Sequence, residues 1–308
     1  MALKSYHSLS EIQDDLYTNR LSCRDLVRSY LSRIHEQNHL NAFLEVFEEE
    51  ALKRAGEIDI KIKNKKAGKL AGAVIGIKDN LCYKNHKVSA SSKILEGFVS
   101  LYNSTVVERL LAEDAIIIGR CNCDEFAMGS SNENSAYGNV LHPLDKTRVP
   151  GGSSGGAAVA VAAGLCIAAL GTDTGGSIRQ PASLCGIVGL KPTYGRVSRY
   201  GAVAYSSSYD QIGPIANNIA DTALILEVIS GADDYDSTVS SKPVPAYSQE
   251  LNQGVSKIKV AYLKDCIEKE GLDPEIKNRV TGIIKKLKEK GHTVDGVEFP
   301  YMDYLVPT

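Results

Sequence analysis

The sequence lacks several features that mark whole classes of protein. Its longest apolar stretch, Ala157 to Leu170, holds about 14 residues and includes Gly164, whereas a membrane-spanning helix needs roughly 18 or more. The net charge is only −2, so there is no general excess of basic residues for non-specific nucleic-acid binding. The seven cysteines form no CxxC pair and the first residues form no apolar signal region, so we expect a reducing, cytoplasmic location.

The residues that are present are typical of a globular protein. Of the 308 residues, 43% are hydrophobic and 23% are charged, which allows a sizeable core. Short apolar runs alternate with longer helical stretches after residue 70, and this alternation predicts an α/β fold. We find no independent domain boundary in the pattern and expect residues 1–308 to form a single domain.

Periodicity and capping residues place the individual elements. Buried strands are predicted over residues 74–77, 115–118, 166–170, 187–190 and 258–263. Helices are predicted after the cap Ser22 and over residues 47–66, 105–112, 157–163, 219–229 and 274–290, the last two with caps at Asn218 and Asp273. Residues 233–249, rich in Asp, Ser, Pro and Tyr, are predicted to form a loop or linker.

Two glycine-serine clusters between residues 150 and 214 are the strongest candidates for a reactive site. Glycine pairs let the backbone approach a ligand closely, and N–H groups at such a loop can hold an anion. If Ser177 attacks a carbonyl, the N–H groups of residues 174–177 could stabilise the negative charge that develops on oxygen. The same loop could instead bind a phosphate or another anion without catalysis.

A nucleophilic serine needs a base, and none of the six histidines lies in this segment. Lys78 ends the apolar run 74–77, which would carry its amine into the interior or to the edge of the sheet. Burial disfavours the ammonium form and lowers the pKa of a lysine, so Lys78 could act as a neutral base. Alternatively, Lys78 pairs with a nearby carboxylate such as Asp79.

A competing motif places the nucleophile elsewhere. Residues 151–155 match the G-x-S-x-G elbow, which would make Ser153 the nucleophile with Asp210 and His292 as partners. Such an elbow follows a strand, whereas residues 146–150 are short, charged and end in Pro150. The context therefore disfavours this interpretation.

The sequence resembles the amidase signature family. The resemblance is carried by G-I-K-D-N at 76–80, G-G-S-S-G-G at 151–156 and G-T-D-T-G-G-S-I-R-Q-P at 171–181. Within that family, residues 124–140, 191–201 and 209–214 are similar to the A subunits of glutamyl-tRNA(Gln) amidotransferases. The resemblance implies an amidase fold with a mixed sheet covered by helices on both faces. It divides the chain into a mainly helical segment over 1–70, a signature core over 71–230 and the start of a C-terminal portion over 231–308.

The resemblance also implies roles for individual residues. Lys78 falls on the family's base, Ser153 on a serine with a cis peptide bond, and Ser177 on the acyl-forming nucleophile. The resemblance implies a Ser-cisSer-Lys triad, a chain of hydrogen bonds in which Ser177 passes its proton to Ser153 and on to neutral Lys78. The expected oxyanion and substrate-binding residues are Thr174, Gly175, Gly176, Met128, Gly129 and Ser130. The expected supporting residues are Ser154, Asp173, Arg179 and Gln180, with Asp173 and Arg179 bracing the loop as an ion pair.

The implied function is that of the glutaminase component of a heterotrimer with B and C subunits. Ammonia released from glutamine would pass through a tunnel to the B subunit, which would convert Glu-tRNA(Gln) to Gln-tRNA(Gln) with ATP and Mg²⁺. We expect no metal or cofactor in this chain itself. The alternatives are a free-standing amidase that acts on another small amide and an inactive interaction piece.

Family members are expected to continue well past Thr308. The later part would return strands to the sheet and bind the α-carboxylate and α-amino groups of glutamine. We therefore expect the 308-residue chain to be a fragment, a truncated product or one piece of a split protein, with low glutaminase activity and low stability by itself.

Overall fold

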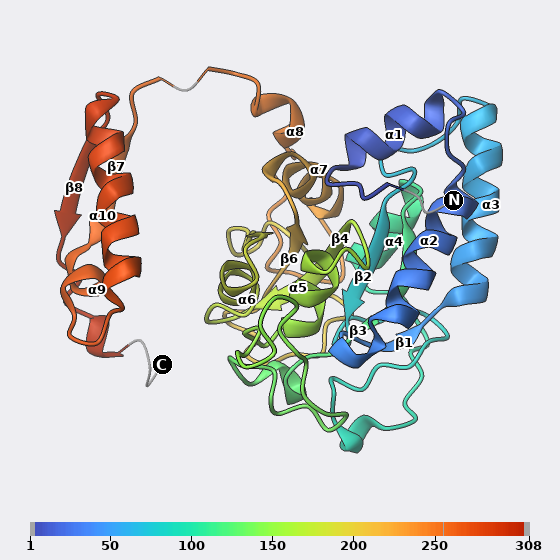
Figure 1. The fold of residues 1–308 in the computed structure, drawn as a ribbon, viewed down its shortest axis with the longest axis horizontal. Helices are drawn as coiled ribbons and strands as arrows, with labels where there is room; N and C mark the ends of the chain where they lie inside the picture. Colours follow the sequence, from blue (N-terminus) through green and yellow to red (C-terminus); the bar gives the residue numbers. More distant parts are fainter. Residues whose placement is uncertain (1–3, 255, 305–308) are drawn as a thin grey trace. The chain divides into compact units, whose positions relative to one another are not determined.

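The structure, a computed structural model, describes residues 4–254 and 256–304. The chain forms two compact units, residues 1–250 and 251–308 (Figure 1). The second unit begins just after the segment 233–249, which was expected to be a loop or linker. The expectation of a single domain with a signature core over 71–230 stays a prediction.

The first unit is built on a mixed six-stranded sheet in the order β1-β3-β2-β4-β6-β5. Strands β2, β3 and β4 are mutually parallel at the centre, whereas β1, β6 and β5 run antiparallel to their neighbours. The strands are β1 Phe43–Val46, β2 Val74–Lys78, β3 Ile116–Cys121, β4 Ala168–Asp173, β5 Val188–Gly189 and β6 Gln211–Ala216. Every residue of β2, β3, β4 and β6 is buried, and the predicted apolar runs account for the first three of these strands.

Helices pack against this sheet and confirm the α/β class. Those of the first unit are α1 Leu9–Tyr17, α2 Cys23–Glu36, α3 Glu48–Lys63, α4 Thr105–Ala112, α5 Gly155–Ala162, α6 Arg179–Leu184, α7 Ile219–Ile229 and α8 Tyr247–Glu250, with short 3₁₀ turns at Asn38–Leu40, Lys93–Leu95 and Glu125–Ala127. Figure 1 shows α2 and α3 side by side, and α5 packs on strands β2 and β4. Helix α5 is buried along nearly its whole length, which explains its all-apolar sequence.

Capping residues set several helix boundaries as predicted. The Ser22 hydroxyl accepts the N–H of Asp25 at 3.1 Å at the start of α2. Asn218 accepts the N–H of Asp221 at 2.8 Å at the start of α7. These side chains satisfy N–H groups that have no partner inside the helix, so the helices begin there.

The second unit holds a parallel two-stranded sheet, β7 Lys259–Leu263 and β8 Thr293–Val297. Its helices are α9 Lys264–Glu268 and α10 Pro274–Glu289, followed by the 3₁₀ turn Met302–Tyr304. Helix α10 begins at the predicted cap Asp273. The prediction of a buried strand over residues 258–263 was wrong in one respect, because every residue of β7 is partly or wholly exposed. Strand β7 pairs only with β8 in the described part of the chain, so it is an edge strand of a two-stranded sheet.

Candidate active site

Lys78 is the last residue of β2, and its side chain is fully buried. Its Nζ lies 2.7 Å from Ser153 Oγ and 2.9 Å from Thr172 Oγ1. Both neighbours are hydroxyl groups, and the Lys78 amine has no carboxylate hydrogen-bond partner among residues 4–254 and 256–304. The Lys78 amine therefore has two hydrogen-bond partners, and neither of them is a carboxylate.

This environment changes the pKa of Lys78. Burial lowers it from the ordinary 10.5 to about 8, while Cys123 and the more distant carboxylates of Asp124, Asp173 and Asp210 act in the opposite direction. Removal from water disfavours the charged form more strongly than these groups favour it. A substantial fraction of Lys78 is therefore neutral near pH 8, as the sequence-based hypothesis of a neutral base requires.

The alternative that Lys78 pairs with Asp79 is wrong. Asp79 is fully buried, and its Oδ1 lies 2.5 Å from Arg120 Nη1. Ser89 Oγ donates to Asp79 Oδ2 at 2.5 Å, and the Ser91 N–H donates to the same oxygen at 2.7 Å. Consecutive residues of an extended strand point to opposite faces, so the Asp79 carboxylate and the Lys78 amine point in opposite directions and have different partners.

Ser153 and Ser154 stand immediately before helix α5. The peptide bond between Gly152 and Ser153 is cis, as the resemblance implied. The Ser154 hydroxyl donates to Thr172 O at 3.1 Å and accepts the Thr172 N–H at 3.3 Å, which ties this turn to β4. The Ser154 N–H donates to Ser177 O at 3.1 Å. These contacts bring the two glycine-serine clusters of the sequence together.

The loop after β4 is organised around the carboxylate of Asp173. Arg179 Nε and Nη2 each lie 2.9 Å from that carboxylate, which confirms the predicted ion pair. Burial alone would raise the pKa of Asp173, but Arg179 and the backbone N–H donors outweigh it and hold this pKa below its usual value. The Gly176 N–H also donates to Asp173, at 2.8 Å.

That last bond corrects one detail of the expected oxyanion loop. The Gly176 N–H is already bonded to Asp173, so it is not available to an oxyanion in this arrangement. In the described part of the chain, the N–H groups of Thr174, Gly175 and Ser177 have no acceptor. The Thr174 hydroxyl is bonded to Asp210 Oδ1 at 2.5 Å. The role of this loop in holding an oxyanion stays a prediction.

Ser177 lies between the loop and helix α6, and it is partly exposed. Its hydroxyl makes no hydrogen bond with any residue that the structure describes, so the bond to Ser153 expected for a proton relay is not formed here. Ser177 is connected to the turn that holds Ser153 through its own carbonyl, which accepts the Ser154 N–H. Its role as nucleophile also stays a prediction.

Gln180 connects the turn that holds Ser153 with the segment 128–130. Its Oε1 accepts the Gly152 N–H at 3.0 Å, and its Nε2 donates to Ser130 O at 2.8 Å. Met128 and Ser130 are exposed, and a Cβ at Gly129 or Gly152 would overlap the Asp124 carboxylate. Both positions therefore require glycine for close packing. The structure places residues 128–130 beside the site through Gln180, and their contact with substrate stays a prediction.

Two buried residues of the cluster were not singled out from the sequence. Thr172 contacts Lys78 directly, and Asn80 Nδ2 donates to Thr172 Oγ1 at 3.1 Å. Both lie inside the motifs that carry the resemblance, but only the spatial pairing of β2 with β4 brings Thr172 to the amine, with Asn80 behind it. The available signal was that polar residues, Asn80 and Thr172, stand close to the ends of apolar runs predicted to be buried strands, where a polar side chain needs a partner.

The elbow interpretation does not fit the structure. Within the described residues, no strand precedes Ser153 between β3 and helix α5. Asp210 accepts the N–H groups of Tyr205 and Ser206 as well as the Thr174 hydroxyl. His292 belongs to the second unit, where its Nδ1 accepts the Ile258 N–H at 3.3 Å.

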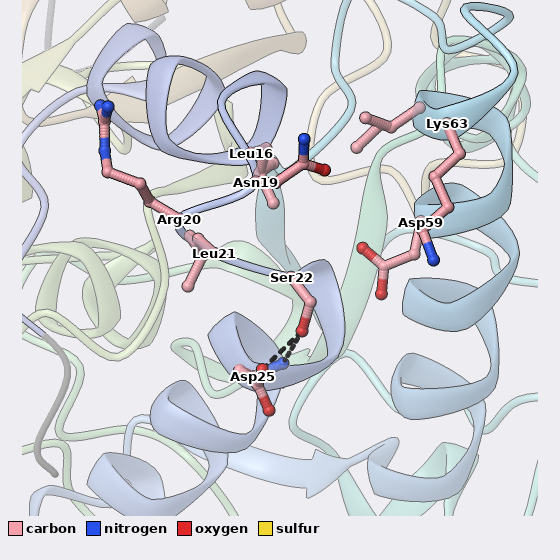
Figure 2. A pocket seen from close by; sticks show the side chains of 9 residues that line it. Leu16, Asn19, Arg20, Leu21, Ser22, Asp25, Asp59 and Lys63 are labelled. Carbon is pink, nitrogen blue, oxygen red and sulfur yellow. Dashed lines mark hydrogen bonds between the residues drawn. The ribbon is translucent and has the colours of Figure 1, made fainter.

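A pocket of about 310 Å³ lies apart from these residues, between the start of α2 and the end of α3. Figure 2 shows Asp59 of α3 facing this space, while the Arg20 guanidinium points away from Lys63 and Asp59. Asp59 accepts the N–H groups of Cys23 and Arg24, and Ser22 is bonded to Asp25. These polar groups satisfy one another, and none of the residues that line this pocket contacts Lys78.

Other features of the described residues bear on the remaining expectations. No group of three or more His, Cys, Asp or Glu side chains in residues 4–254 and 256–304 is arranged to hold a metal ion. No helix in that part of the chain is long and apolar enough to cross a membrane. All seven cysteines are free, and only Cys266 is exposed.

Comparison with known proteins gives the family. A sequence profile described as Amidase matches residues 25–308. The A subunit of the glutamyl-tRNA(Gln) amidotransferase of Chlorobium phaeobacteroides is 48% identical over 98% of this chain and 63% of its own length. The crystal structure of the corresponding A subunit from Thermotoga maritima has a TM-score of 0.81 and 39% identity, over 95% of this chain and 62% of that chain.

The native peptide amidase of Stenotrophomonas maltophilia is also similar, with a TM-score of 0.85 and 33% identity over 96% of this chain and 63% of that chain. This chain thus spans slightly less than two thirds of the length of these relatives. The profile match covers nearly all of the 308 residues, and the solved structures share the same fold. The chain belongs to the amidase family.

Proposed function

We propose that this chain is the glutamine-hydrolysing A subunit of a tRNA-dependent amidotransferase that converts Glu-tRNA(Gln) to Gln-tRNA(Gln). The observation that carries the proposal is the buried Lys78 amine, which lies 2.7 Å from Ser153 Oγ and has hydroxyl partners. The 48% identity to proteins named as A subunits of glutamyl-tRNA(Gln) amidotransferase supports the choice of substrate and complex.

The proposed acylation uses Ser177 as nucleophile and Ser153 as a relay. Ser177 Oγ attacks the side-chain amide carbon of glutamine, and its proton passes to Ser153 Oγ while the Ser153 proton passes to neutral Lys78. The tetrahedral intermediate then collapses and the C–N bond breaks. The departing nitrogen takes the proton that Lys78 holds, by way of Ser153, and leaves as ammonia, so Lys78 is neutral again. The product on the enzyme is a glutamyl ester of Ser177.

This relay requires Ser177 to turn its hydroxyl toward Ser153 when substrate binds. The Ser177 backbone is already anchored to the turn that holds Ser153, because the Ser154 N–H donates to the Ser177 carbonyl at 3.1 Å. Only the Ser177 side chain has to turn. The N–H groups of Gly175 and Ser177 are the donors proposed for the oxyanion, together with that of Thr174. Asp173 and Arg179 hold the loop in shape through their ion pair.

The second half of the proposed reaction hydrolyses the ester. Neutral Lys78 again acts as base through Ser153 and takes a proton from a water that attacks the ester carbon. The same proton then returns to Ser177 Oγ as the ester C–O bond breaks, which releases glutamate and frees Ser177. The proposed partners are B and C subunits, of which the B subunit uses ATP and Mg²⁺ to activate the γ-carboxyl of glutamate on tRNA(Gln). We place the complex in the cytoplasm, and we propose that ammonia travels within it because free ammonia would be protonated in water.

The test is to measure ammonia release from glutamine by the chain with and without the B and C subunits. We expect activity in the complex and its loss in the Ser177→Ala variant. Glutamine-dependent formation of Gln-tRNA(Gln) in the same mixtures tests the assignment to the amidotransferase. Failure of both reactions in a folded complex with wild-type chain would overturn the proposal.

A second candidate is a free-standing amidase that acts on another small amide. The observation in its favour is the similarity to the peptide amidase, with 33% identity. It predicts hydrolysis of peptide amides by the chain alone, with no increase when the B and C subunits are added. The same assays therefore separate the two candidates.

A further inference from the structure

The Lys78 amine has a second partner besides Ser153, the hydroxyl of Thr172. Strands β2 and β4 are parallel neighbours with Ile77 opposite Leu170, so Lys78 and Thr172 come together although 94 residues separate them. The distance from Lys78 Nζ to Thr172 Oγ1 is 2.9 Å, and Thr172 is only 4% exposed. Solvent therefore contributes little to the hydrogen bonding of this hydroxyl.

Thr172 is itself held by Asn80, which is 1% exposed. Asn80 Nδ2 donates to Thr172 Oγ1 at 3.1 Å and to Val203 O at 3.2 Å. A carbonyl can only accept, so Val203 fixes the amide nitrogen of Asn80 on the side of Thr172. Both N–H bonds of the amide are thereby used, and Thr172 receives one of them.

The carbonyl oxygen of the Asn80 amide, by contrast, accepts no hydrogen bond from the described residues. Asn80 Oδ1 is buried and has no hydrogen-bond partner within the part of the chain that the structure describes. A buried unpaired acceptor costs stability. Local conflicts of this kind persist mainly at functional sites, where another property of the residue is needed. The donor side of Asn80 leads directly to the lysine amine.

We propose that Asn80 and Thr172 form a positioning pair that aims the Lys78 amine at Ser153, a role that rests on the proposed function of Lys78 as base. A lysine side chain has four rotatable bonds, and one fixed partner for Nζ restricts where its lone pair points. After Lys78 takes the Ser153 proton, Thr172 Oγ1 accepts a hydrogen bond from the new ammonium. The pair thus stabilises the protonated state that the relay must form.

The experiment compares Thr172→Val with Thr172→Ser. Valine keeps the shape of threonine and removes the hydroxyl, whereas serine keeps the hydroxyl. One readout is the NMR titration of isotopically labelled Lys78, which needs no substrate. We expect Thr172→Val to move the midpoint toward acid by about one pH unit, because the ammonium loses a charge-assisted hydrogen bond. Thr172→Ser should leave the midpoint at the wild-type position.

The second readout is the rate at which Ser177 is labelled by a fluorophosphonate, followed by intact mass. We expect Thr172→Val to slow labelling about tenfold, because the base is no longer held in position. Asn80→Leu should change both readouts in the same direction by a smaller amount, since Thr172 remains but is not anchored. This variant keeps the proposal testable if valine at position 172 prevents folding.

An unchanged Lys78 midpoint in folded Thr172→Val and Asn80→Leu variants would overturn the positioning pair. Slower labelling with an unchanged midpoint would also overturn it, because general damage to the site predicts that result. Failure of the wild-type chain to hydrolyse glutamine in a folded complex with the B and C subunits would instead count against the proposed function. The NMR titration would still decide the inference in that case, since it requires no turnover.

Discussion

Two buried basic residues stand on neighbouring strands of the sheet, and their surroundings differ. Arg120 on β3 contacts the Asp79 carboxylate at 2.5 Å and Glu45 at 3.3 Å. Lys78 on β2 contacts two hydroxyls and no carboxylate in the described residues. Arg120 is therefore a charged residue with its counter-charge, whereas Lys78 is a residue that burial moves toward the neutral form.

The comparison shows how one strand end can serve two purposes. Asp79 and Arg120 form a charged cluster with Ser89 and Ser91 that fastens the segment after β2. Lys78, one residue earlier, faces Ser153 and Thr172 on the other side. Loss of one partner on the side with paired charges would leave a buried charge uncompensated, whereas the side on which the lysine contacts no carboxylate is suited to proton transfer.

The largest expected effect is at Ser177, on the Lys78 side. Ser177→Ala should abolish both amide hydrolysis and covalent labelling by a γ-diazoketone analogue of glutamine, because no neighbouring group replaces the covalent intermediate. Intact mass and peptide mapping measure the labelling. Modification at Ser153 or Ser154 with Ser177 untouched would contradict the assignment of the nucleophile.

Exchange of the cation type is the next test. Lys78→Arg should lower Ser177 acylation by about a hundredfold or more, nearly as much as Lys78→Ala, because arginine keeps the charge but does not deprotonate in a protein. Arg120→Lys is the matched control, since that cation needs only to stay charged beside Asp79. If Lys78→Arg retained most of the acylation rate, Lys78 would be a structural cation like Arg120.

A change on the other side should affect stability before chemistry. Asp79→Ala leaves Arg120 buried without its closest partner, so the free energy of unfolding should fall by about 3 kcal/mol. Glu45→Gln is the control. Glu45 is 35% exposed and lies 3.3 Å from Arg120, so its loss should cost less than about 1 kcal/mol. Chemical denaturation measures both values. A smaller loss for Asp79→Ala than for Glu45→Gln would reverse the comparison.

Much of the fold could be predicted from local signals. Helices α4 and α7 have the predicted bounds because their apolar periodicity is clear, and α7 also begins at the predicted cap Asn218. Strand β6 was missed because Gln211, Gly213 and Pro214 interrupt the pattern of a buried strand. Its burial comes from pairing with both β4 and β5, which no local window shows.

The candidate site was predictable to a similar degree. The burial of Lys78 follows from the apolar run before it, and the motifs pointed to Ser153 as its neighbour. The contact with Thr172 depends on the register of β2 against β4, and the use of the Gly176 N–H by Asp173 depends on loop geometry. Neither is encoded in the spacing of residue types along the chain.

The central claim is that Lys78 is a neutral base, and its titration tests this most directly. NMR of labelled lysine in the Ser177→Ala variant, with Lys78→Arg used to assign the signal, should show a pKa of about 8 for Lys78. Because the folded pKa lies below the ordinary value of 10.5, acylation by wild-type chain should rise as pH increases through about 8. Folding stability should also rise between these two pH values, where only the unfolded chain still binds the proton. A Lys78 pKa near 10.5, with an acylation rate that does not change around pH 8, would contradict the account.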